Sequence, residues 1–276
     1  MSNIFKQLAQ LQDLKFALLE KQSLLPDKEF TEINESINII LKNLPDELAS
    51  KYKKLQKHYK NPVVVLSIGT SFCSGCSITL PTTLVQEIIS KKKFHFCPNC
   101  SRIIICREVP SVVTRNFVNK AVGIARFSSP NLMIPNLKAE KRDDALLELT
   151  EIIAKAGLTD KPKELLKKSI EREELVSTVV SNSIAFPHVR TKGLGGLCFA
   201  MGIKKRGLKF DPKDRKLIKI IFFTVIPSTA ESFYLQLIAS FMEVFRSDNS
   251  RKKILAEKTS EGLWKTLNGL TEDIIK

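Results

Sequence analysis

Residues 183–190 read Ser-Ile-Ala-Phe-Pro-His-Val-Arg, and this stretch decides how the second half of the chain is interpreted. An apolar tripeptide leads into a proline that fixes the backbone, and His188 follows at once, with Arg190 two residues later. His188 is the only histidine after residue 95. This pattern presents one ring nitrogen at the end of a strand and indicates a phosphate acceptor. A histidine without a chemical role is the simpler interpretation of His188 taken alone.

Helical and strand patterns alternate on both sides of this stretch. Four segments are predicted to be helices from their periodicity and stop signals: 141–157, 160–174, 231–245 and 251–267. Residues 197–203 and 217–226 are predicted to be strands, and the second is apolar enough to be buried on both faces. We therefore predict an α/β sandwich, a mixed sheet flanked by helices, over residues 131–275.

The first 60 residues show three shorter helical stripes and no cluster of chemically active side chains. Helices are expected over 3–24, 30–44 and 46–59, with Pro26 and Pro45 at the breaks. Helices joined by short breaks pack antiparallel. We predict an α-helical hairpin or short coiled coil over residues 1–60, acting in interaction or oligomerisation.

Four of the six cysteines form two Cys-x-x-Cys pairs that are separated by 20 residues. Two such pairs bring four thiolates to one ion, which is the ligand set of a structural zinc site. A closed site has no open ligand position, so we expect no metal-based catalysis. The alternative is a redox dithiol, which would make this segment a zinc-dependent redox switch. The predicted ligands of one structural Zn²⁺ are Cys73, Cys76, Cys97 and Cys100, in a small ribbon over residues 61–107.

Positive charge is concentrated around this ribbon. The chain carries a net charge of +15, and residues 61–127 hold eight Lys or Arg against two Asp or Glu. Such a segment favours nucleic acid, an anionic surface or an acidic protein, although a solvated basic surface is the simpler interpretation. No run approaches 18 apolar residues, so we expect no membrane insertion. The N-terminus lacks the apolar core of a signal peptide, and a cytoplasmic location is expected.

The stretch from Pro62 to Cys106 resembles the four-cysteine zinc ribbon that follows a coiled coil in many bacterial proteins. The resemblance rests on the apolar strand before the first cysteine pair, on Leu80-Pro81 after it, and on Arg102-Ile103 after the second pair. Ser101 stands where the family often has glycine, and the preceding helical segment is shorter than usual. The resemblance implies a structural zinc and a role in binding a partner.

Beyond a linker expected at 108–130, residues 131–275 resemble the enzyme IIA domain of the fructose–mannitol type, including its nitrogen-regulatory relatives, from the bacterial phosphotransferase system. The motifs follow one another in the family's order: Arg172-Glu173-x-x-x-Ser177-Thr178, Ile184-Ala185-Phe186-Pro187-His188 and Phe210-Asp211-x-x-Asp214. The resemblance implies an α/β fold. It also implies that His188 accepts a phosphoryl group from phosphorylated HPr and passes it to an enzyme IIB or a regulatory target.

The same resemblance implies roles for the neighbours of His188. A neutral imidazole is a nucleophile near pH 7. Arg172 is the candidate clamp on the phosphoryl oxygens, because a guanidinium offers a planar fork of donors. Thr178, like Ser177 beside it, can donate a hydroxyl hydrogen bond.

Two further residues complete the candidate site. Arg190 is a second candidate clamp on the phosphoryl group. Tyr234 stands where the family has a second histidine. A tyrosine can donate a hydrogen bond to a phosphate but cannot carry the charge of an imidazolium.

These observations predict a phosphocarrier or regulatory protein of a phosphoenolpyruvate-dependent phosphotransferase system, with a phosphohistidine intermediate and a ribbon that recruits a partner. The alternative is a non-catalytic adaptor in which the enzyme IIA fold and the basic ribbon bind protein or nucleic acid. Phosphorylation of His188 would favour the first. Salt-dependent binding of nucleic acid that survives loss of His188 would favour the second.

Overall fold

The computed structural model describes residues 2–21, 27–59, 63–67, 73, 75–76, 78–90, 94–106, 122–180, 183–191, 197–212, 216–227 and 230–275. The chain divides into two compact units, Met1–Val109 and Pro110–Lys276. Most of the expected linker, and Asp214 of the third motif, lie outside the described residues. No helix within the described ranges is long and apolar enough to cross a membrane.

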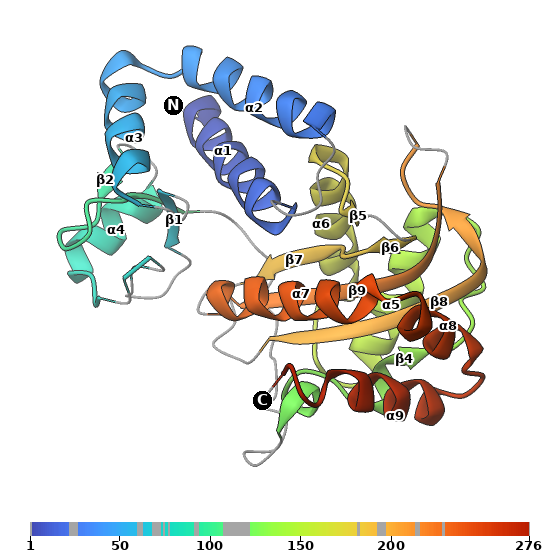
Figure 1. Ribbon diagram of the computed structural model, residues 1–276. Helices are drawn as coiled ribbons and strands as arrows, with labels where there is room; N and C mark the ends of the chain where they lie inside the picture. The colour runs from blue at the N-terminus through green and yellow to red at the C-terminus, as the bar shows by residue number, and fades with distance from the viewer. Residues whose placement is uncertain are drawn as a thin grey trace. The chain divides into compact units, whose positions relative to one another are not determined.

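The first unit opens with the expected helices, which are α1 (Ser2–Lys21), α2 (Asp27–Lys42) and α3 (Asp46–His58). Helices α1 and α2 pack against each other (Figure 1). The buried residues of α2 and α3 recur three or four positions apart, as the stripes predicted: Ile33, Ile37 and Leu41, then Leu48, Tyr52 and Leu55. The prediction of N-terminal helices is therefore confirmed.

The ribbon of the first unit contains a three-stranded sheet. Its strands are β1 (Val64–Ser67), β3 (Ile103–Cys106) and β2 (His95–Phe96), in that order. Strand β3 pairs in parallel with β1 and antiparallel with β2, and helix α4 (Thr82–Ser90) lies against it. Helix α1 also contacts β1 and β3. A ribbon of this size has little core of its own, so this helix supplies part of the apolar surface that buries the sheet.

The second unit is built on a mixed six-stranded sheet. Its path runs β4 (Met133–Ile134), β8 (Cys198–Lys209), β9 (Leu217–Pro227), β6 (Ile184–Ala185) and β5 (Val179–Val180), and β7 (His188–Thr191) also pairs with β9. Strands β6 and β7 are both parallel to β9, and Phe186-Pro187 separates them. Every residue of β9 from Ile220 to Pro227 is buried, as predicted for a strand covered on both faces.

Helices flank this sheet, so the predicted α/β sandwich is confirmed. Helices α5 (Arg142–Lys155) and α6 (Pro162–Leu175) pack together on one side, and α7 (Glu231–Arg246) lies on the other (Figure 1). A short 3-10 turn at Gly123–Arg126 lies in the segment 108–130 expected to be a linker, and a second at Pro130–Leu132 begins at its last residue. Ile124 is fully buried in the core there, and the Ser128 hydroxyl donates to the Phe199 carbonyl at 2.8 Å.

The prediction of a single helix over 251–267 is wrong. The chain forms α8 (Asp248–Ala256) and α9 (Ser260–Thr271), with a break at 257–259. Thr259 lies at the N-cap of α9, and its hydroxyl oxygen accepts a hydrogen bond from the Gly262 N–H at 3.0 Å. A threonine at an N-cap accepts a hydrogen bond from a backbone N–H in the first turn, which has no partner within the helix. This favours the start of a new helix at Thr259 over the continuation of α8.

A bulge in β8 requires glycine at one position. The register between β8 and β9 shifts between Ile203 and Leu208. Gly207 lies in this bulge with a φ of +76°, and a Cβ atom there would be 2.6 Å from the Cβ atom of Leu217. Any other residue would meet both an unfavourable backbone conformation and a steric clash.

We expect Gly207→Ala to destabilise the second unit by roughly 1–3 kcal/mol. Gly157→Ala, where φ is +72° but no atom lies within 4 Å, should show the backbone cost alone. Gly269→Ala in α9 meets nothing within 4 Å and should be neutral or stabilising by up to about 1 kcal/mol. Urea unfolding followed by the fluorescence of Trp264, the only tryptophan, measures this unit. Equal stability of Gly207→Ala and Gly269→Ala would contradict the argument.

Candidate functional site

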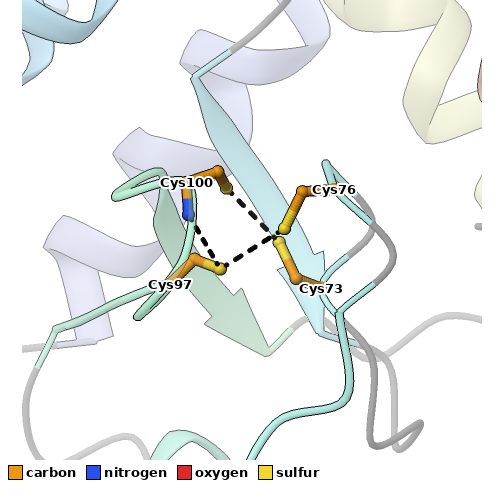
Figure 2. Close-up of side chains that lie close together, drawn as sticks. All are labelled: Cys73, Cys76, Cys97 and Cys100. Carbon is orange, nitrogen blue, oxygen red and sulfur yellow. Dashed lines mark hydrogen bonds between the residues drawn. The ribbon is translucent and has the colours of Figure 1, made fainter.

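The four predicted cysteine ligands come together in the first unit (Figure 2). Their Sγ atoms all lie within 4.8 Å of one another, with Cys73 and Cys100 3.8 Å apart and Cys76 and Cys97 3.6 Å apart. A tetrahedral zinc ion with Zn–S bonds of about 2.3 Å requires sulfurs separated by about 3.8 Å. The side chains converge from both cysteine pairs, so the donor set fits one Zn²⁺.

The turns around the cysteines fix this geometry through the backbone. The Cys97 N–H donates to the Arg102 carbonyl at 2.9 Å, and the Cys100 N–H lies 3.5 Å from the sulfur of Cys97. Ser101 has a φ of 57°, in the left-handed region that favours glycine. Burial opposes ionisation of Cys76, but the Ile78 N–H and neighbouring donors outweigh it and lower the pKa of this thiol to about 6. Cys76 therefore offers a thiolate at neutral pH without metal, whereas burial raises the pKa of Cys73 and of Cys97.

Two residues outside the cysteine pairs support the cluster. Tyr59, just after α3, donates from its hydroxyl to the Cys100 carbonyl at 2.8 Å. Arg102 is 7% exposed, and it donates to the Gly75 carbonyl at 3.2 Å while its guanidinium lies 3.7 Å from the Tyr59 ring centroid. Four thiolates around Zn²⁺ leave excess negative charge, and Arg102 offsets part of it. The sequence did not indicate Tyr59, whose position had suggested only helix packing.

We expect one zinc per chain in the purified protein and none in Cys97→Ser, as measured by elemental analysis. Cys198→Ser is the matched control, because Cys198 is a free, buried thiol in β8 and lies outside the cluster. Retention of zinc by Cys97→Ser would contradict the assignment.

The ring of His188 is held at both nitrogens. The Nε atom of Arg172 donates to Nε2 at 3.3 Å. On the other side of the ring, Nδ1 lies 2.7 Å from the Tyr234 hydroxyl and 3.2 Å from the Phe186 carbonyl oxygen. A guanidinium is always a donor, so Nε2 is the acceptor and the ring proton is on Nδ1. The lone pair on Nε2 is therefore directed toward a cation. Nε2, and not Nδ1, is the ring nitrogen that can act as a nucleophile.

Three elements bring these groups together. His188 begins β7 immediately after Pro187, Arg172 comes from the last turn of α6, and Tyr234 comes from the first turn of α7. Arg172 is 6% exposed, and its Nη1 donates to the Val176 carbonyl at 2.8 Å. This contact fixes the guanidinium, so that its Nε remains aimed at the ring.

The expected hydroxyl donors make local contacts instead of meeting the ring. The Glu173 carboxylate accepts from the Thr178 N–H at 2.6 Å and from the Thr178 hydroxyl at 2.7 Å. The Ser177 oxygen accepts from the Val179 N–H at 3.4 Å. Glu173 therefore closes the turn between α6 and β5, just after Arg172. The motif containing Glu173 was recognised, but its pattern gave no sign of this role.

The environment of His188 keeps the ring neutral. The side chain is 1% exposed. Burial lowers the pKa of His188 well below its usual value of 6.5, the charges of Arg172 and Arg190 lower it further, and the Phe186 carbonyl opposes them. A neutral imidazole is the form that can act as a nucleophile.

This lowered pKa makes the stability of the second unit depend on pH. Below about pH 6.5 the unfolded chain binds a proton at His188 that the folded chain does not, so stability falls as the pH decreases. We expect the free energy of unfolding to drop by about 1 kcal/mol more between pH 7.5 and 5.5 in the wild type than in His188→Gln. Urea titrations read at Trp264 measure this difference. An identical pH dependence in the two proteins would show that the ring is not held neutral.

The fold and the two sites define an enzyme IIA-like α/β domain joined to a four-cysteine ribbon. The family model described as "Phosphoenolpyruvate-dependent sugar phosphotransferase system, EIIA 2" matches residues 126–269, and the model described as "C4-type zinc ribbon domain" matches residues 73–104. The chain belongs to this EIIA family, and its role is that of a phosphocarrier or regulatory protein. The ribbon carries a structural zinc.

Each of the similar proteins covers about half of the chain. The PTS system fructose-specific EIIA component of Haloferax volcanii is 24% identical over 131 residues, which cover 48% of this chain and 85% of that protein. The nitrogen regulatory protein of Pseudomonas aeruginosa is 20% identical over 143 residues, covering 52% and 93%. The fructose-specific EIIABC component of Bacillus subtilis is 20% identical, and the match spans 21% of its length. The solved structure of IIA-Ntr from Neisseria meningitidis is 18% identical, with a TM-score of 0.46 over 51% of this chain and 96% of that one.

Proposed function

We propose that His188 is phosphorylated on Nε2 and that phosphorylated HPr is the donor. The observation that carries this proposal is the pair of contacts on the ring. Arg172 donates to Nε2, so that Nε2 has a lone pair, and the proton is held on Nδ1 by the Tyr234 oxygen and the Phe186 carbonyl. A buried ring with a defined tautomer and a cation at the reacting nitrogen is prepared for phosphoryl transfer.

In the transfer step, the lone pair of Nε2 forms a bond to phosphorus while the bond from phosphorus to the donor's ring nitrogen breaks. The electron pair of that broken bond returns to the donor nitrogen, and the donor ring leaves as a neutral imidazole with the proton on its other nitrogen. His188 keeps its Nδ1 proton, so its ring becomes cationic. The Phe186 carbonyl and the Tyr234 oxygen accept from this N–H and stabilise the charge.

The neighbours of His188 take different roles in this proposal. Arg172 contacts the reacting nitrogen and is the clamp on the phosphoryl oxygens. Tyr234 lies at Nδ1 and not at the reacting side, so it is a positioning residue that replaces the family's second histidine. Thr178 supports the site through its two hydrogen bonds to Glu173, which hold the turn after α6.

The remaining assignments follow from the family and the charge pattern. We propose that the phosphoryl group passes to an enzyme IIB or regulatory target protein, and that the helices (1–60) and the ribbon (61–107) recruit a partner to the EIIA domain (131–275). A cytoplasmic location agrees with a donor of the HPr type. The basic charge of the ribbon segment favours an acidic partner surface.

Incubation with phosphoenolpyruvate, enzyme I and HPr should add one phosphoryl group to the wild-type chain, detected as a mass increase at neutral pH. The group should be labile in acid, as expected for a phosphohistidine. His188→Gln should remain unlabelled, and His58→Gln, which changes an exposed histidine of α3, should be labelled like the wild type.

Arg172→Gln should be labelled at least tenfold more slowly, because it loses a charge-assisted hydrogen bond of roughly 1.5–3 kcal/mol. A wild-type chain that stays unlabelled while a standard enzyme IIA is charged in the same mixture would overturn the proposal. The non-catalytic adaptor would then be the better description.

A further inference from the structure

Arg190 lies beside His188 in the same strand. Both belong to β7, and residues two apart in a strand project from the same face of the sheet. The Arg190 side chain is 6% exposed, so it is held against the protein instead of extending into solvent. Its charge acts on the His188 ring together with that of Arg172.

The two arginines whose charges act on the ring belong to different elements. Arg172 comes from α6 and reaches Nε2 with its Nε, while its Nη1 is engaged by the Val176 carbonyl. Arg172 therefore has only part of its donor fork available for the reacting side. A phosphoryl group on Nε2 presents three oxygens and close to two negative charges, which is more than this part of one guanidinium can satisfy.

The charge arrangement is matched to the phosphorylated state. Two guanidinium groups beside one imidazole disfavour protonation of the ring and favour a dianion attached to it. Arg190 also belongs to the strand that His188 begins, and β7 is paired with β9 from His188↔Thr224 to Thr191↔Pro227. This pairing fixes the spacing between the two side chains along the strand.

We propose that Arg190 is a second ligand of the phosphoryl group, which lies between the guanidinium of Arg172 from α6 and that of Arg190 from β7. This inference rests on the proposed function, because it requires a phosphoryl group on His188. It assigns the site one cation from α6 and one from β7. It predicts a phosphohistidine that hydrolyses more slowly than one held by a single arginine.

The test compares Arg190→Gln with Arg206→Gln, which removes an exposed arginine from β8 of the same unit. Both proteins are phosphorylated to completion with phosphoenolpyruvate, enzyme I and HPr, and the carrier proteins are removed. Phosphorus NMR then gives the pKa of the phosphoryl group, and intact mass gives its rate of hydrolysis at pH 7.

In Arg190→Gln the pKa of the phosphoryl group should rise, since a cation no longer favours the dianion. The lifetime of the phosphohistidine should fall roughly tenfold, as expected for loss of a charge-assisted hydrogen bond. Arg206→Gln should keep wild-type values for both, and Arg190→Lys should restore most of the pKa. A purely structural role for Arg190 would leave the pKa of the phosphoryl group unchanged in any variant that folds.

The outcomes separate the two proposals. A wild-type chain without label overturns the proposed function and this inference together. A labelled wild type with unchanged pKa and lifetime in Arg190→Gln overturns the inference alone. If Arg190→Gln does not fold, the test uses NMR of the wild-type protein. The side-chain nitrogen signals of Arg190, assigned by comparison with Arg190→Lys, should shift on phosphorylation. An unshifted signal would overturn the inference.

Discussion

The hydrogen bond from Arg172 Nε to His188 Nε2 is the constraint on which the site depends. A guanidinium does not lose its protons, so this contact determines which ring nitrogen has the lone pair, whatever the other neighbours do. The contact is possible because α6 packs against β7. The hydrogen bonds between Glu173 and Thr178 hold the turn that follows α6. The packing of α6 against β7 therefore sets the tautomer of His188, and the tautomer determines which ring nitrogen can react.

The first unit depends on a different kind of interaction, the cysteine cluster beside its small sheet. Its sheet is too small to be stable through apolar burial alone, and the cysteine cluster supplies a second source of stability. Tyr59 joins the end of α3 to the backbone of a ligand, and Arg102 spans from Tyr59 to the other cysteine turn. Metal binding and the docking of α3 are therefore expected to depend on each other.

Much of this arrangement could be predicted from the sequence, where the pattern is local. Helical stripes, the apolar run of β9 and the two cysteine pairs are patterns among neighbouring positions. The ordered motifs around His188 indicated which residues to look for in a site. Some of the missed features depend on contacts between distant residues. Tyr234 is 46 positions from His188, and which ring nitrogen it meets is set by how α7 packs. The break before α9 had a local signal in Thr259, which apolar periodicity alone does not register.

The register of β7 on β9 has a consequence for how the geometry around His188 can be lost. The Thr224 N–H donates to the Pro187 carbonyl at 2.9 Å, and His188 aligns with Thr224 in the next step of the ladder. Because side chains alternate across a sheet, one extra residue before His188 would turn the imidazole to the opposite face. An insertion in this short segment would therefore separate the imidazole from Arg172 and Tyr234 while every site residue remained in the sequence.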